Sequence, residues 1–257
     1  MSGIVFVLLG CGSASVDLEE EPFGNVKSAV WLDLQQDVES GDDPHFHQLM
    51  MSTTNNVCKS MQDLMQPLAD SYSQHFSVIP YDTEEACELS RSYFEEAAVL
   101  VDDLYEKDGA NQFLLEPYDP DADLGDPPDG EAPDGTQYIH ARSDTSHYFF
   151  GTVNLIARNP WAAIAEEIRC GEDSDALNDD IEEALAETVQ ALYLSSGTLT
   201  LETARDGEAL RLYDFAGGVV DDDQVSRGTI EAKGTFEHCT VAWRGEGEAP
   251  LLPSLLR

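Results

Sequence analysis

The sequence predicts an α+β fold, in which an antiparallel sheet, sandwich-like or an open barrel, carries an inserted helical hairpin and two further helices. Two observations indicate this class. Segments with helical periodicity are grouped rather than alternating with strands, and residues 198–244 have the pattern of successive β-strands joined by turns. Segregated helices and strands favour α+β over a parallel α/β sheet, so we expect strands from both ends of the chain to form the sheet.

The first half of the chain predicts two strands followed by a helix. Residues 25–34 and 46–51 carry the apolar pattern of strands. A helix is expected to begin after Asn55 or Asn56, because asparagine side chains cap helices well. The helix is expected to end near Pro67 or to resume after it as far as Tyr72, since proline lacks the N–H that a helix interior needs.

A second helix is expected between Asp82 and Gly109. Asp82 and Glu85 have the spacing of a capping box, and glycine is a common residue just past a helix end. Apolar residues recur between them at helical spacing: Ala86, Leu89, Tyr93, Ala97, Leu100, Val101 and Leu104. Together with the preceding helix this segment forms the predicted hairpin.

The second half begins with a break. Residues 117–135 are rich in proline, glycine and acidic residues and have no apolar period, so they predict a loop. Residues 138–142 and 147–157 then predict a β-hairpin. Asn159 as a cap and Pro160 in the first helical position begin a short helix.

A longer helix and a run of strands complete the pattern. The helix is expected over residues 175–194, with Gly197 as its stop. The strands expected after it are 198–204, 209–216, 229–236 and 239–244, the first two joined by a turn with an Asp-Gly pair. We expect one α+β domain over residues 25–250 with 117–135 as an acidic loop; the alternative is two domains, 25–116 and 136–250.

The charge is strongly unbalanced. Fifty-one Asp and Glu residues against 13 Lys and Arg give a net charge of −38. Such a surface repels phosphate groups and anionic lipids, which excludes non-specific binding to nucleic acid or to membrane surfaces. Like charges repel over about 10 Å in 0.1 M salt and only about 3 Å in 1 M salt, so a protein with this charge is best suited to a saline environment. Its composition resembles that of proteins from salt-adapted organisms.

The N-terminus carries a short apolar run, Ile4–Leu9, that overlaps the motif Leu8-Leu9-Gly10-Cys11. This motif resembles the lipobox of bacterial secreted lipoproteins. The resemblance implies that residues 1–10 are the remnant of a signal peptide, that a lipid is attached to Cys11, and that residues 11–24 form a lipidated tether. It also implies an extracytoplasmic location, periplasmic or at the cell surface, with the lipid anchor as the only contact with the membrane.

Two other interpretations use the same residues. The run Ile4–Leu9 has the composition of a buried strand. Residues Gly10–Ser15 read G-x-G-x-x-S, and Asp33 follows at about the distance of a ribose-binding acid, which would indicate a cytosolic nucleotide-binding enzyme. However, Pro22 and Gly24 break the helix whose N-terminus would have to face the phosphates.

The cysteines favour export. With Cys11 lipidated an even number remains: Cys58, Cys87, Cys170 and Cys239. Four cysteines in an exported protein predict two disulfides, for which three pairings exist. We expect Cys58–Cys87, which would join the helical hairpin, and Cys170–Cys239.

The acidic loop is a candidate calcium site. Carboxylates recur at short intervals along it: Asp119, Asp121, Asp123, Asp126 and Asp129. Calcium binds six to eight oxygen ligands, and carboxylates of a turning loop can converge on one ion. The pattern resembles the calcium loops of thrombospondin type 3 repeats, although Leu124 stands where that pattern has glycine. The alternative is a solvated linker.

Histidines provide a second metal candidate. His45 and His47 are two residues apart, so a strand would place them on one face, as in a zinc or copper pair. A site needs a third ligand, and the sequence alone does not place the others: His75, His140, His147 and His238. The alternative is that they are surface histidines.

No motif specific to an enzyme occurs in the sequence. The leading hypothesis is therefore a lipid-anchored extracytoplasmic protein of binding or structural type, with a protein or a glycan as its ligand. The alternative enzyme is a secreted or surface hydrolase whose site combines His and Asp/Glu residues that are distant in sequence. A pocket holding two or more histidines beside carboxylates would favour that alternative.

Overall fold

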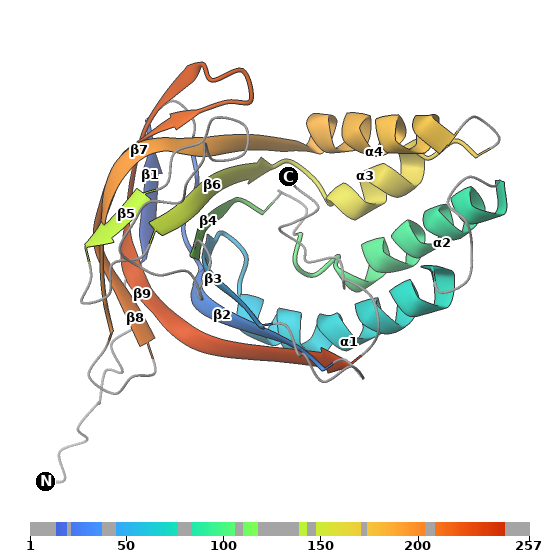
Figure 1. The fold of residues 1–257 in the computed structure, drawn as a ribbon, viewed down its shortest axis with the longest axis horizontal. Coiled ribbons are helices and arrows are strands. Elements are labelled where there is room, and N and C mark those ends of the chain that lie inside the picture. The colour runs from blue at the N-terminus through green and yellow to red at the C-terminus, as the bar shows by residue number, and fades with distance from the viewer. Residues whose placement is uncertain are drawn as a thin grey trace, which may run out of the picture.

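The computed structural model describes residues 14–19, 22–37, 45–76, 84–105, 110–117, 139–142, 148–170, 174–203 and 209–244. Within these ranges it contains nine strands and four helices (Figure 1), and the α+β class is confirmed. The strands are β1 (Ser15–Leu18), β2 (Ser28–Asp37), β3 (His45–Ser52), β4 (Gln112–Pro117), β5 (Ile139–Arg142), β6 (Tyr148–Ile156), β7 (Val189–Thr203), β8 (Ala209–Val220) and β9 (Ser226–Arg244). The helices are α1 (Val57–Phe76), α2 (Glu84–Leu100), α3 (Pro160–Glu167) and α4 (Ser174–Thr188).

The nine strands form one sheet that closes on itself. Their order is β1-β9-β2-β3-β4-β6-β5-β7-β8, and β8 also pairs with β9. Most pairs are antiparallel, but β2–β9 and β5–β7 are parallel, so the sheet is mixed and closed rather than antiparallel and open. The 19-residue strand β9 makes closure possible, because it pairs with β8 on one side and with β1 and β2 on the other.

A first apolar core fills the inside of the closed sheet. It contains one face of most strands, and the Phe113 and Phe215 rings stack in it with their centroids 5.7 Å apart. Gly197 belongs to this packing. A Cβ at that position would lie 2.7 Å from the Phe215 ring, so the glycine allows β7 and β8 to approach.

A second core lies between the outside of the sheet and the helices (Figure 1). The rings of Tyr93 and Phe94 on α2 surround Trp161 on α3, with centroid distances of 6.0 and 5.7 Å to the indole. Strand β9 contributes to both cores, because Phe236 is buried inside the sheet whereas Cys239 is buried against the helices. The packing of the second core holds α1, α2 and α3 against the outside of the sheet.

Two element boundaries differ from the expectations. Helix α1 continues through Pro67 to Phe76. The expected helix over 175–194 stops at Thr188, and the chain continues directly into β7. The apolar residues of 189–194 fit either period, and here strand pairing with β6 decides the outcome. Gly197 is thus a strand residue rather than a helix stop.

The four cysteines do form two disulfides, but the pairing differs from the expected one. The bonds are Cys58–Cys239 and Cys87–Cys170, with Cα–Cα distances of 5.7 and 5.5 Å. Cys58 and Cys87 each lie near the start of their helix. The starts of two antiparallel helices lie at opposite ends of a hairpin, about 30 Å apart for 20 residues, so they do not meet.

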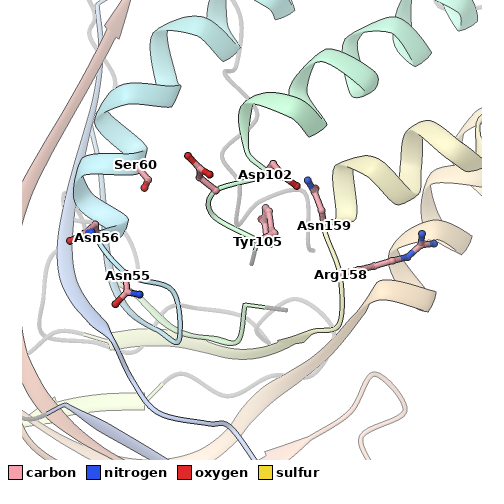
Figure 2. A pocket seen from close by; sticks show the side chains of 8 residues that line it. Asn55, Asn56, Ser60, Asp102, Tyr105, Arg158 and Asn159 are labelled. Atoms are coloured by element: carbon pink, nitrogen blue, oxygen red, sulfur yellow. The ribbon is translucent and has the colours of Figure 1, made fainter. Parts of the chain in front are cut away.

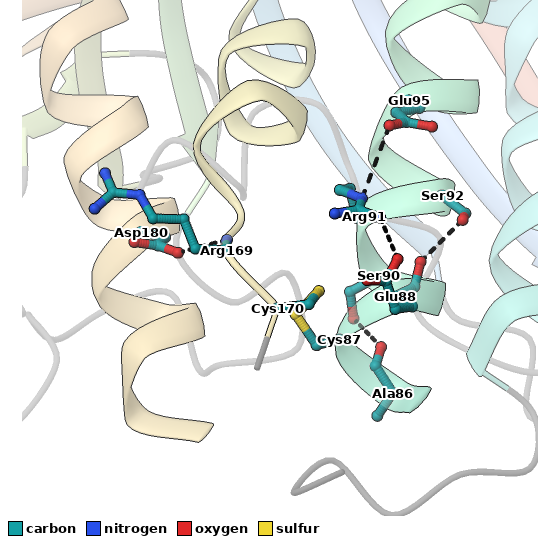
Figure 3. The surroundings of a disulfide bond; sticks show 10 residues. All are labelled: Ala86, Cys87, Glu88, Ser90, Arg91, Ser92, Glu95, Arg169, Cys170 and Asp180. Atoms are coloured by element: carbon teal, nitrogen blue, oxygen red, sulfur yellow. Dashed lines mark hydrogen bonds and ion pairs between the residues drawn. A yellow bond between two sulfur atoms is a disulfide. The ribbon is translucent and has the colours of Figure 1, made fainter. Parts of the chain in front are cut away.

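Each disulfide instead joins two elements that are distant in the sequence. Cys58 ties α1 to β9, and Cys87 ties the start of α2 to Cys170, three residues past the end of α3 (Figure 3). The backbone N–H of Arg169 donates a hydrogen bond of 2.9 Å to Asp180 of α4, which holds the segment next to Cys170. Disulfide bonds such as these two suit an oxidising, extracytoplasmic environment. None of the described helices is both long enough and apolar enough to cross a membrane.

Candidate functional site

A polar cavity of about 590 Å³ lies where the start of α1, the end of α2 and the start of α3 meet (Figure 2). Its described lining residues come from three chain segments: Asn55, Asn56 and Ser60; Asp102, Asp103 and Tyr105; Arg158 and Asn159. All of them have polar side chains. Convergent hydrogen-bonding groups in a concave site are typical of places where small molecules bind.

Asn159 fixes one wall of the cavity. Its Oδ1 accepts hydrogen bonds from the backbone N–H groups of Trp161 and Ala162, at 3.1 and 3.4 Å, and so caps α3 as the sequence predicts. Its Nδ2 donates to the backbone carbonyl of Ala98 on α2 at 3.0 Å. One side chain therefore holds the end of α2 against the start of α3.

The opposite wall is the turn before α1. Asn56 has a positive φ of 54°, a conformation that asparagine tolerates better than most residues. Its carbonyl accepts from the backbone N–H of Ser60 at 3.0 Å, and the Ser28 hydroxyl accepts from the N–H of Val57 at 3.4 Å. This left-handed residue turns the chain from β3 into α1 and places Asn55 and Asn56 at the cavity.

Tyr105 lies between these two walls (Figure 2). Only 3% of the residue is exposed, and its buried hydroxyl makes no hydrogen bond of normal geometry with the described residues, although the Trp161 side chain is close enough to lower its pKa against the larger effect of burial. Burial raises the pKa of the phenol well above its ordinary value, so Tyr105 stays protonated at physiological pH. It can therefore donate a hydrogen bond but cannot act as a base.

The charges of the cavity are mainly negative. Asp102 and Asp103 face it together with Arg158, whose Nη1 lies 2.8 Å from the Glu166 carboxylate. The guanidinium is thus partly neutralised by an acid outside the cavity. No histidine or cysteine is present among the described lining residues, whose side chains offer many hydrogen-bond donors and acceptors.

A second cavity, of about 420 Å³, lies at the junction of α4 with β6 and β7. More than half of its described lining residues are apolar, and the polar ones are Asn111, Glu187, Thr188 and Gln190. The Asn111 amide is already engaged, because it donates to the Phe23 carbonyl at 2.7 Å and accepts from the Ile156 N–H at 3.0 Å. The first cavity is therefore the better candidate site.

Several residues predicted from the sequence lie outside the described part of the chain. These are the lipobox residues with Cys11, most of the glycine motif that begins at Gly10, and the whole acidic loop with Asp119, Asp121, Asp123, Asp126 and Asp129. The lipid anchor, the nucleotide loop and the calcium site therefore remain predictions. Among the described side chains, no three His, Cys, Asp or Glu are close enough to hold a metal ion.

The histidines are distributed over several elements. His45 and His47 both lie on β3, where the register pairs them with Gln35 and Asp33 of β2. His238 lies on β9, which pairs with β2 on the side of β2 opposite to β3. His75 lies on α1 and contacts Glu96 of α2. None of these histidines is among the described residues that line either cavity, so the hydrolase alternative gains no support from them.

Sequence reasoning missed the polar cavity. Its residues occur as polar pairs at helix ends, Asn55-Asn56, Asp102-Asp103 and Arg158-Asn159, and each pair alone looks like a cap or a solvated turn. Comparison of the chain with protein-family models, with curated proteins and with solved structures found no match.

Proposed function

We propose that this chain is a lipid-anchored, extracytoplasmic binding protein, and that the polar cavity between α1, α2 and α3 binds a neutral saccharide. The two disulfides support the location, because such bonds persist in oxidising compartments. They also support a binding role, since they tie two of the three helices that frame the cavity to distant parts of the chain. A framework held in this way loses little conformational freedom when a ligand binds.

The observation that carries the proposal is the buried hydroxyl of Tyr105. A buried hydroxyl without a partner costs about 1–3 kcal/mol. This one belongs to a residue that lines the cavity, and the hydroxyl itself is covered in the free protein. A ligand hydroxyl that enters the cavity and displaces the atoms covering the Tyr105 oxygen would accept its hydrogen bond and recover that cost.

The rest of the lining indicates the class of ligand. Asparagine amides and the Ser60 hydroxyl both donate and accept, while the carboxylates of Asp102 and Asp103 accept only. A sugar presents hydroxyls that do both, so it matches this mixture. Anionic ligands are disfavoured, because the cavity is mainly negative and the protein carries a net charge of −38.

Binding is tested by saturation-transfer NMR with a panel of neutral mono- and disaccharides. At least one is expected to bind the full chain. In Tyr105→Phe, which removes only the hydroxyl, the affinity should fall about tenfold, the equivalent of one hydrogen bond of about 1.4 kcal/mol. The melting temperature should not fall, because the free protein loses a buried polar group without a partner.

Tyr213→Phe is the matched control, since Tyr213 is 46% exposed and lies on β8. Its affinity should equal that of the wild type. Absence of binding across the panel would contradict the proposal. Equal affinity of the Tyr105→Phe and wild-type proteins would also contradict it, because the Tyr105 hydroxyl would then contribute nothing to binding.

A further inference from the structure

The outer face of β9 is covered by helices along its second half and open along its first half. Cys239 and Trp243 are buried on this face in the core that packs against the helices. Glu231 and Lys233, earlier on the same face, are exposed. In Figure 1 the first half of β9 and its neighbour β8 lie on the side of the sheet away from the helices. This part of the sheet therefore presents side chains directly to the surroundings.

Arg211 of β8 and Lys233 of β9 project from the open part of this face. Their chain neighbours Leu212 and Ala232 are buried inside the closed sheet, so alternation along the strands places Arg211 and Lys233 outside. Both are exposed. The guanidinium carbon of Arg211 lies 5.7 Å from the centre of the ring of Tyr213, a residue that is 46% exposed. We call Arg211, Tyr213 and Lys233 the basic–aromatic patch.

The two cations of the patch differ from most other described basic residues in their charge environment. Ion pairs with carboxylates neutralise the following side chains: Lys59, Arg91, Arg158, Arg169, Arg227 and Arg244. Arg211 and Lys233 form no ion pair with any residue that the structure describes. In a chain with 51 acidic and 13 basic residues, two cations without a carboxylate partner stand out. They are available to an anionic group from outside the protein.

The patch lies close to the point where the proposed lipid anchor joins the fold. Strand β1 pairs with β9, and Ser15 at its start is the register partner of Lys233. Cys11 precedes Ser15 by four residues. Four residues span at most about 14 Å when fully extended. A lipid on Cys11 would therefore keep Ser15, and with it Lys233, near the surface of the bilayer.

We propose that the basic–aromatic patch faces the membrane and binds the phosphates of phospholipid headgroups once Cys11 is anchored. This inference rests on the lipid anchor of the proposed function but not on its saccharide. Arginine and lysine form charge-assisted hydrogen bonds with phosphate, and tyrosine is enriched where a protein meets the headgroup region. The patch thus adds a second membrane contact to the single one expected from the sequence.

The acidity of the protein makes this contact dependent on the anchor. A net charge of −38 repels an anionic bilayer, and the exposed acids Glu231 and Glu237 border the patch along β9. The contact is therefore confined to a few headgroups and does not hold the free protein. Once the chain is tethered, the patch decides which face turns to the bilayer, because each cation near an anionic surface favours that orientation about fivefold.

The orientation is tested with the chain that begins at Cys11, the mature form under the proposed function. The other four cysteines are in disulfides, so a maleimide lipid in vesicles of phosphatidylcholine and phosphatidylglycerol couples to Cys11 alone. A photoreactive benzophenone amino acid is placed at position 213 or, as the matched control, at position 99, because Val99 on α2 is 77% exposed. Cross-linking to lipid is expected to be about fivefold or more higher from position 213.

Charge variants then test the role of the cations. Arg211→Gln and Lys233→Gln should each lower the lipid cross-linking from position 213 about fivefold, and about 1 M KCl should lower it as well. Lys59→Gln is the matched control, because Lys59 on α1 is 78% exposed and already pairs with Asp63. It should leave the cross-linking unchanged. The variants replace exposed side chains, so their melting temperatures are expected to equal that of the wild type.

Three results from the coupled protein would overturn the inference alone. They are equal cross-linking from positions 213 and 99, cross-linking that is unchanged when Arg211 and Lys233 are both replaced by glutamine, and an equal loss in Lys59→Gln. Native protein whose Cys11 carries no lipid would overturn the proposed anchor and this inference with it. Because the coupled protein is anchored chemically, the two failures are distinguished.

Discussion

Single asparagines determine the two walls of the cavity. Asn159 was predictable from the sequence as the cap of α3, because an Asn-Pro pair before an apolar helical stretch is a standard start signal. Its second bond, to the carbonyl of Ala98, was not predictable, since it joins residues 61 positions apart. That bond is what makes α2 and α3 a common wall.

We predict that Asn159→Ala lowers the free energy of unfolding by about 1–3 kcal/mol, because it removes the cap and the bond to α2 together. Denaturation by urea measures this change. Asn159→Asp keeps the capping oxygen but lacks the amide donor, so its stability should lie between those of the other two proteins. A stability of Asn159→Ala equal to the wild type would contradict the described role.

Tyr105 illustrates the limit of sequence reasoning at this scale. A tyrosine that follows a helix has no pattern that distinguishes a core residue from a ligand-binding one. Tyr105 becomes a candidate binding residue only because it is buried at a polar cavity. That position depends on how α1, α2 and α3 pack.

At the scale of elements, helices α1 and α2 are joined by a small polar contact as well as by their apolar faces. The Ser71 hydroxyl donates to Glu96 Oε2 at 2.8 Å, and His75 Nε2 lies 3.2 Å from the same oxygen. The bond from Ser71, followed by that from His75, lowers the pKa of Glu96 below its ordinary value. The ionised form of Glu96 is therefore favoured in the folded protein.

This shift determines the sign of a pH effect. A lowered folded-state pKa stabilises the protein at pH values above the ordinary pKa of glutamate, and the contribution is lost as the pH falls through the lowered value. We predict that Glu96→Gln reduces stability at neutral pH by less than about 1 kcal/mol, because the carboxylate is half exposed, and that its stability declines less on acidification.

Urea denaturation at several pH values between neutral and about pH 3 tests this expectation. Glu95→Gln is the matched control: it changes the neighbouring residue of α2, which contacts Arg91 of the same helix. The control should keep the pH profile of the wild type. A Glu96→Gln profile parallel to that of the wild type would show that the contact with Ser71 and His75 contributes nothing.

Most elements were predictable, whereas their connections were not. The strand at 46–51, the helical hairpin and the capped helix at Pro160 follow from local patterns. The apolar spacing of residues 189–194 fits both a helix and a strand, and pairing with β6 makes them a strand. The disulfide pairing failed for a geometric reason, since Cys58 and Cys87 lie at opposite ends of the hairpin.

For the whole molecule, closure of the sheet is the property that the sequence conceals. Strand β9 pairs with β2, and this parallel contact between the two ends of the chain has no local signal. The same contact brings Asp33 next to His238 and positions the α1 disulfide at Cys239. The polar cavity likewise combines segments that are distant in the sequence, which explains why the sequence alone does not reveal it.

We propose that the protein folds and acts in an oxidising compartment, tethered through Cys11. The most direct test is peptide mapping by mass spectrometry, without reduction, of protein purified from its own cells after alkylation of all thiols. The account predicts linked peptides for Cys58–Cys239 and Cys87–Cys170, and an N-terminal Cys11 whose sulfur carries lipid. Five alkylated cysteines in a chain that begins with Met1 would contradict it.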